Sequence, residues 1–136
     1  TAAGLEKVQR YLQGQVGLLG GAIPIARKIL FICTANIQRS LTAEHYFKSL
    51  YPQVSFQSAG VSFKECQRNN STLCTVELLE WADQIFVFEQ MHIDRIFEHT
   101  EQRFVDKIHN LDIEDRYQYM QEELVELLKA RFNAYM

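Results

Sequence analysis

Hydrophobic and polar positions follow a repeating order after the first 28 residues: a short apolar run, a turn, then a segment with helical spacing. Residues 29–32 are apolar without interruption, which is typical of a strand buried on both faces of a parallel sheet. Residues 40–50 have the spacing of a helix, with Phe47 and Leu50 placed to face the interior. Pro52 ends this helix, since the residue before a proline disfavours helical backbone.

The same order continues to the end of the chain. It predicts strands at residues 54–57, 84–88 and 103–108, helices at residues 73–81, 91–97 and 121–132, and a polar loop at residues 64–70. The helix side chains expected in the core are Val76, Leu78, Leu79, Leu124, Leu127 and Leu128. Strands that alternate with helices over short connections predict an α/β fold of three layers, αβα, with a central four-stranded parallel sheet.

The first 28 residues differ from the rest, because five of the six glycines lie there. Residues 5–12 have the pattern of a short helix, and residues 14–24 that of a flexible linker or arm. We therefore expect two parts: an extension of unknown role at residues 1–28 and one folded domain at residues 29–136.

Composition narrows the class of partner. A net charge of −3 with scattered basic residues disfavours a nucleic-acid partner, which normally meets a basic face. Three cysteines without a Cys-x-x-Cys pair indicate a reducing compartment. The uncharged run at residues 16–26 is too short and too rich in glycine to cross a bilayer. We expect a cytoplasmic protein with no membrane partner.

The most informative chemistry lies directly after the first predicted strand. Cys33 and Arg39 stand six positions apart, between that strand and the first helix. The loop between them gives backbone N–H groups of Thr34, Ala35, Asn36, Ile37 and Gln38 that can surround a tetrahedral oxyanion. A cysteine at the floor of such a ring can attack phosphorus, and an arginine can grip two phosphoryl oxygens. The alternative is a buried structural cysteine beside a solvated arginine.

Further matches give this segment a family resemblance. The matching loop residues are Cys33, Asn36, Arg39, Ser40, Ala43 and Glu44. The other matching segments are residues 58–60 (Ser-Ala-Gly), 81–89 and 111–117. With these residues the chain resembles the low-molecular-weight protein tyrosine phosphatases, and most closely a compact bacterial branch, over about residues 29–134. The resemblance implies a cysteine-dependent phosphatase with its phosphate loop between the first strand and the first helix.

The resemblance also implies roles for single residues. Asp115 is expected to protonate the leaving oxygen and then to activate water, with Asp112 as the other candidate. Ser58 is expected to hold Asn36 by a hydrogen bond; the alternative is an ordinary serine at the end of a strand. Tyr117 and Tyr119 can form an aromatic wall for a phosphotyrosine ring, although tyrosines before a helix are also common at the edge of a core.

Two loop residues carry expectations of their own. Asn36 is expected at positive φ, which asparagine tolerates better than most residues. Ser40 has two candidate roles, since its hydroxyl can donate to the Cys33 sulfur and stabilise the thiolate, or can cap the helix. The helix N-terminus, the loop N–H groups and Arg39 all favour the thiolate form of Cys33.

The segment also departs from the family pattern. Ala35 replaces a glycine, which is acceptable only at negative φ. Gln38 replaces a second loop cysteine, so Cys33 is expected to over-oxidise more easily. Leu41 replaces a proline at the helix start, and Arg116 replaces the proline after the acid. Cys66 and Cys74, the two remaining cysteines, are expected to be structural or incidental.

The predicted function is hydrolysis of phosphotyrosine in proteins, or of small aryl phosphates, through a phosphocysteine intermediate. No cofactor and no metal are expected, because the four histidines lack ligand spacing and most are expected at the surface. Two alternatives stay open. One is an oxyanion-binding protein with impaired turnover, and the other is an arsenate reductase, for which relay cysteines near the third strand are missing.

Overall fold

The computed structural model describes residues 27–135, so the predictions for residues 5–12 and 14–24 lie outside the described part. Its strands are β1 (Arg27–Cys33), β2 (Val54–Gly60), β3 (Gln84–Val87) and β4 (Ile108–Asn110). Its helices are α2 (Arg39–Leu50), α3 (Phe63–Asn69), α4 (Val76–Trp81), α5 (Gln90–Thr100) and α6 (Glu122–Phe132), with a 3-10 turn at Val105–Lys107. Among these helices, none has the length and apolar character needed to cross a membrane.

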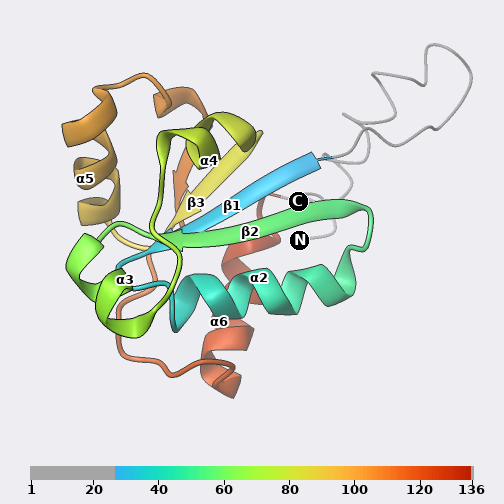
Figure 1. The fold of residues 1–136 in the computed structure, drawn as a ribbon. Helices are drawn as coiled ribbons and strands as arrows, with labels where there is room; N and C mark the ends of the chain where they lie inside the picture. The colour runs from blue at the N-terminus through green and yellow to red at the C-terminus, as the bar shows by residue number, and fades with distance from the viewer. Residues whose placement is uncertain (1–26, 136) are drawn as a thin grey trace, which may run out of the picture.

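The four strands form one parallel sheet in the order β2-β1-β3-β4 (Figure 1). The predicted αβα fold with a four-stranded parallel sheet is confirmed. β1 lies between β2 and β3, and it pairs with β2 from Arg27 to Cys33 and with β3 from Ile29 to Ile32. Its neighbours on both sides and its helices on both faces explain the uninterrupted apolar run in the sequence.

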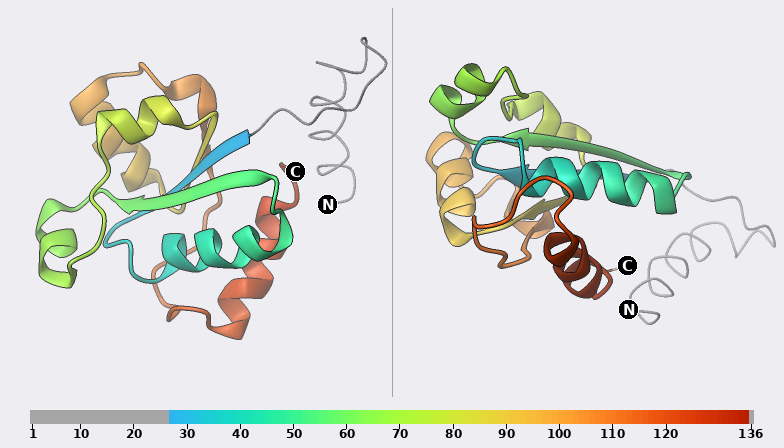
Figure 2. Two further views of the ribbon diagram at one scale, coloured as in Figure 1. Left: turned by 45° about the vertical axis from the view of Figure 1, so that its right-hand side comes forward. Right: turned by 90° about the horizontal axis from the view of Figure 1, so that it is seen from below.

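Successive β1 side chains divide between two cores. Ile29 and Phe31 pack with α2 and α6 on one face, while Leu30 and Ile32 pack with α4 and α5 on the other. Figure 2 shows the two helix layers on opposite sides of the sheet. Phe31 occupies the centre of the first core: its ring centroid lies 5.3–6.5 Å from those of Phe47, Phe56, Phe86, Phe88 and Phe132.

The carboxyl ends of β1 and β2 approach each other closely at Gly60. A Cβ at this position would lie 2.6 Å from the Cys66 sulfur and 2.6 Å from the Thr34 carbonyl oxygen. Only glycine fits between these atoms, because real Cβ contacts are not this short. Gly60 therefore lets α3 pack directly behind the loop that follows β1.

The polar segment at residues 64–70 was expected to be a loop, and that prediction is wrong. α3 occupies most of it, with Ser62 as the N-cap accepting a hydrogen bond from the Glu65 N–H. The helix ends at Asn70, whose φ of 53° is left-handed. Cys66 is the single buried residue of α3. A helix with one buried side chain shows no periodic apolar pattern in the sequence, so the pattern did not predict it.

The fourth strand was also placed wrongly. Residues 103–108 hold the 3-10 turn Val105–Lys107, and β4 begins only at Ile108. Phe104 is buried beneath Arg103 and Lys107 as the end of a turn, not as a strand position. β4 is also only three residues long, which is too short for alternation to show.

Helix boundaries and cores differ in smaller ways. α4 begins at Val76 because Thr75 caps it, while Leu73 forms an isolated bridge with Gly60. Val76 is consequently 38% exposed rather than in the core, whereas Leu79 is buried as predicted. Leu50 is 49% exposed, because Tyr51 packs against Phe47 in its place. Phe47, Leu124 and Leu128 are fully buried as predicted, and Leu78 and Leu127 are partly buried.

The start of α5 contains a buried histidine, His92, whereas His45 and His99 are exposed as expected. Glu89 and His92 form a reciprocal capping box: the Glu89 carboxylate accepts the His92 backbone N–H, and the His92 ring accepts the Glu89 backbone N–H. Burial is the main reason that the pKa of His92 falls from 6.5 to about 4. The Arg39 cation lowers the pKa further, and Asp115 opposes that effect.

This pKa predicts that the protein loses stability as the pH falls from about 6.5 to about 4. The unfolded chain binds a proton at this histidine in that window and the folded chain does not, so acid favours unfolding by up to about 3 kcal/mol. Urea unfolding between pH 4.5 and 7.5 measures the slope. His92→Asn is expected to flatten it.

Exposed His99 provides the matched control, and His99→Asn should keep the wild-type slope. Burial also lowers the pKa of His109, so this residue adds to the pH dependence of the unfolding free energy with the same sign. Its contribution remains in both variants. Equal slopes in the wild type and in His92→Asn would contradict the prediction.

Candidate active site

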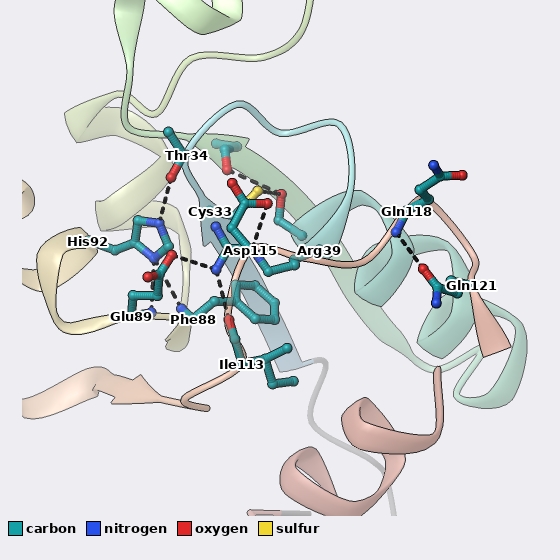
Figure 3. Close-up of polar contacts among 12 residues, drawn as sticks. Cys33, Thr34, Arg39, Phe88, Glu89, His92, Ile113, Asp115, Gln118 and Gln121 are labelled. Atoms are coloured by element: carbon teal, nitrogen blue, oxygen red, sulfur yellow. Dashed lines mark hydrogen bonds and ion pairs between the residues drawn. The ribbon is translucent and has the colours of Figure 1, made fainter. Parts of the chain in front are cut away.

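A cavity of about 300 Å³ opens at the carboxyl end of the sheet, over the loop between β1 and α2. Figure 3 shows Cys33, Thr34, Arg39 and Asp115, four of the residues that line it. The loop lies at the carboxyl edge of a parallel sheet, where open α/β folds bind ligands. Two further elements complete the wall: α3, and the segment that follows β4. The lining residues are Cys33, Thr34, Ala35, Ile37, Gln38, Arg39, Glu65, Asn69 and Asp115.

Cys33 lies at the floor of this cavity as the last residue of β1, and it is 3% exposed. Its sulfur lies 3.0 Å from the Ser40 hydroxyl oxygen. Ser40 was also a candidate helix cap, and that role is wrong: α2 begins at Arg39, and its N-cap Gln38 has no side-chain cap bond. The Ser40 hydroxyl therefore belongs to the cysteine and not to the helix end.

Asn36 fixes the direction of the hydrogen bonds around Ser40. Its Oδ1 accepts the backbone N–H of Thr72, so its Nδ2 must donate, and it does so to Ser40 at 2.8 Å and to Ser58 at 2.9 Å. The Ser58 hydroxyl in turn donates to Glu44 at 2.5 Å. The predicted bond between Ser58 and Asn36 is present.

The Ser40 proton is left with two possible acceptors. These are the Cys33 sulfur at 3.0 Å and the Ala59 carbonyl oxygen at 3.4 Å. The shorter contact favours the sulfur, and a thiolate is the stronger acceptor because it is charged. The geometry therefore suits a hydroxyl that stabilises the anionic form of Cys33.

The loop backbone also agrees with its sequence. Asn36 has φ of 56°, so the expected positive φ is confirmed. Ala35 is not among the described residues at positive φ, which is the condition under which a Cβ is tolerated there. The N–H groups of residues 34–38 donate to no backbone or side-chain acceptor in the described part of the chain. A run of free N–H groups at a cavity is a site for an anion.

Arg39 is a buried cation and not a solvated side chain. It is 1% exposed, and one terminal nitrogen donates to the Glu89 carboxylate at 2.7 Å and to the Ile113 carbonyl at 2.8 Å. Its Nε has no hydrogen-bond partner among the described residues and makes an ion-pair contact of 3.9 Å with the Asp115 carboxylate. A buried donor without an acceptor costs free energy. An oxyanion bound in the cavity would give the Nε proton the acceptor that it lacks.

The two candidate acids, Asp115 and Asp112, line different cavities. Asp115 lines the cavity over Cys33 and its side chain is 63% exposed. Asp112 has a left-handed backbone and lines a neighbouring cavity of about 330 Å³. Asp115 is thus the carboxylate at the phosphate loop.

The two tyrosines do not line the cavity over Cys33. Tyr117 borders the neighbouring cavity and lies beneath the Arg116 guanidinium. Tyr119 is bonded to the His45 ring, with its hydroxyl oxygen 2.6 Å from Nδ1. Ile37, Gln38, Glu65 and Asn69 form the rim instead.

Glu89 and His92 belong to the site, although neither was predicted to. Glu89 holds Arg39, and the His92 Nε2 lies 3.0 Å from the Thr34 hydroxyl. The sequence held a signal for them: both residues directly follow β3, so they lie at the carboxyl edge of the sheet, as does the loop of Cys33.

Cys66 packs behind the loop, with its sulfur 3.8 Å from the Ala35 carbonyl oxygen. Burial raises the pKa of the Cys66 thiol, and that of Cys74 to about 12, so both stay protonated. These surroundings suit the structural role expected for them.

Comparison with known proteins agrees with this arrangement. A family model described as low molecular weight phosphotyrosine protein phosphatase matches residues 28–135. No curated protein matches the chain.

Among solved structures, Vibrio vulnificus Wzb in complex with benzylphosphonate is 22% identical, with a TM-score of 0.62, and the match covers 80% of this chain and 94% of that one. The tyrosine phosphatase Wzb from Escherichia coli in complex with phosphate is 24% identical, with a TM-score of 0.60 and coverage of 82% and 94%. The YwlE arginine phosphatase from Geobacillus stearothermophilus is 24% identical, with a TM-score of 0.62 and coverage of 79% and 90%.

At these identities the solved structures show a shared fold, and the family model carries the assignment. It spans nearly all of the described residues, including the loop of Cys33 and the segment of Asp115. The chain belongs to the low molecular weight phosphotyrosine protein phosphatase family and is a cysteine-dependent phosphatase.

Proposed function

We propose that this phosphatase hydrolyses phosphotyrosine in proteins, or small aryl phosphate monoesters, through a phosphocysteine on Cys33. One observation carries the proposal. One small cavity is lined by Cys33, by buried Arg39, whose Nε has no hydrogen-bond partner among the described residues, and by four loop residues with free N–H groups, Thr34, Ala35, Ile37 and Gln38. Such a cavity favours a phosphoryl group above the sulfur.

In the first step the Cys33 thiolate attacks phosphorus. A sulfur–phosphorus bond forms as the bond to the aryl oxygen breaks, and Asp115 gives its proton to that oxygen. The negative charge on the three equatorial oxygens is met by the loop N–H groups and Arg39. Bidentate binding uses Nε and the second terminal nitrogen, because the first is held by Glu89 and Ile113.

In the second step water displaces the cysteine. The Asp115 carboxylate takes a proton from water, the water oxygen attacks phosphorus, and the sulfur leaves as a thiolate. Ser40 stabilises that thiolate with its hydroxyl proton. Asp115 is supported as the acid over Asp112 because it alone of the two lines the cavity.

Ile37 supports an aryl substrate, since it offers the cavity rim an apolar surface for a ring. Tyr117 and Tyr119, the predicted aromatic wall, are not among the residues that line this cavity. Gln38, Glu65 and Asn69 make the rest of the rim polar. The division into an extension at residues 1–28 and a phosphatase domain at residues 29–136 stays a proposal.

The proposed mechanism makes a prediction about Cys33 and Asp115. Cys33→Ser is expected to abolish hydrolysis of para-nitrophenyl phosphate, because the alcohol is a far weaker nucleophile than the thiolate. Asp115→Asn is expected to lower kcat by roughly a hundredfold or more through loss of the proton donor. Steady-state assays under reducing conditions measure both.

Asp112→Asn is the matched control and should retain activity. A wild-type protein that binds vanadate but releases no nitrophenol would favour the oxyanion-binding alternative and overturn the enzymatic mechanism. Arsenate reduction with thioredoxin would favour the reductase. A phosphoarginine peptide hydrolysed faster than a phosphotyrosine peptide would reject the aryl substrate class.

Another prediction concerns the carboxylate that holds Arg39. Glu89→Gln is expected to lower kcat/KM roughly tenfold and to weaken vanadate inhibition, because a charge-assisted hydrogen bond no longer fixes the guanidinium. Glu114→Gln, which removes an exposed carboxylate paired with Arg116, should change neither quantity. Unchanged or tighter vanadate inhibition in Glu89→Gln would contradict this prediction and show that the Ile113 carbonyl alone fixes the Arg39 guanidinium.

A further inference from the structure

A hydrogen bond joins the loop to α5 beside the nucleophile. The side chain of Thr34, the residue after Cys33, lies with its hydroxyl oxygen 3.0 Å from the Nε2 of His92 (Figure 3). Thr34 lines the same cavity as Cys33 and Asp115. His92 is fully buried beneath it. The direction of this bond decides what the threonine can offer to a substrate.

The ring of His92 can exist in only one neutral form. Its Nδ1 faces two backbone donors, the N–H of Phe88 at 3.2 Å and the N–H of Glu89 at 3.1 Å. A backbone N–H cannot act as an acceptor, so Nδ1 must carry the lone pair and Nε2 the proton. Nε2 therefore donates, and the Thr34 oxygen accepts.

The threonine proton is then left over. The Thr34 hydroxyl receives one hydrogen bond from His92, and its own proton has no acceptor within residues 27–135. The remaining direction available to a donor on the cavity wall is the cavity itself, where the other donors to an oxyanion lie. In the mechanism proposed above, the loop N–H groups and Arg39 bind the equatorial phosphoryl oxygens, and the bridging oxygen has Asp115 as its donor.

We propose that the Thr34 hydroxyl donates a hydrogen bond to the oxygen that bridges phosphorus and the leaving group, and that His92 is the positioning residue that orients it. The inference rests on the phosphatase mechanism above and adds a second donor at the leaving oxygen. Asp115 transfers its proton to that oxygen, while Thr34 shares its proton and keeps it. A donor at this place matters most when the leaving group is a poor one, because more negative charge then develops on the oxygen.

Two variants of Thr34 test the donor with two substrates. Thr34→Val removes the hydroxyl and keeps the shape, and Thr34→Ser keeps the hydroxyl. For phenyl phosphate, whose phenolate is a poor leaving group, Thr34→Val is expected to lower kcat/KM about tenfold. For para-nitrophenyl phosphate the loss is expected to be about threefold or less. Thr34→Ser is expected to recover most of the loss with both substrates.

A double-mutant cycle tests the role of His92. His92→Asn keeps an acceptor near the position of Nδ1 for the capping box and loses the donor toward Thr34. It is expected to show the same dependence on the leaving group as Thr34→Val. In the double variant the losses should not add, because each single change removes the same interaction.

The outcomes separate this inference from the mechanism on which it rests. Thr34→Val with wild-type kcat/KM for both substrates, or with equal losses for both, overturns the role of Thr34. Full addition of the two losses, with no dependence on leaving group for His92→Asn, overturns the positioning role of His92. Cys33→Ser that still turns over would instead reject the mechanism itself, whatever the threonine variants show.

Discussion

The buried ion pair between Arg39 and Glu89 is the constraint on which the rest of the site depends. An arginine that is 1% exposed needs a partner, because an unpaired buried charge is strongly destabilising. Glu89 and the Ile113 carbonyl hold one terminal nitrogen and leave Nε toward the cavity. The same pair ties α2 to the start of α5 and to the segment that carries Asp115, so it places three parts of the chain around one anion.

Hydrogen-bond direction gives the site its electrostatic character. Backbone N–H groups, which can only donate, set the orientation of Asn36 through Thr72 and of His92 through Phe88. The orientation of Asn36 leaves the Ser40 proton for the Cys33 sulfur or the Ala59 carbonyl oxygen, and the orientation of His92 leaves the Thr34 proton without an acceptor in the described part of the chain. A cavity surrounded by donors favours the thiolate, the phosphoryl group and the leaving oxygen alike, since all three carry negative charge.

The departures from the family pattern have local consequences that the structure resolves. Ala35 has no positive φ, so its methyl group is compatible with the loop. Gln38 becomes the N-cap residue of α2 without a side-chain bond, and the loop still closes because Thr42 bonds its carbonyl. Arg116 lies over the Tyr117 ring and leaves Asp115 at the cavity. None of the three removes a group from the proposed reaction.

The sequence by itself determined the alternation of strands and helices, the loop between β1 and α2, and the residues Cys33, Asn36 and Arg39 in that loop. These follow from neighbours in the chain, where hydrophobic period and motif spacing act. Asp115 was expected only from the resemblance of its segment to the family. It could not place β4 or α3, because each is too short to show a period. Only the tertiary structure decided that Glu89 pairs with Arg39 and that His92 reaches Thr34, 58 residues away. Such contacts depend on which strands have their carboxyl ends side by side at one edge of the sheet. The order of the strands in the sheet decides this, and no local sequence pattern reveals that order.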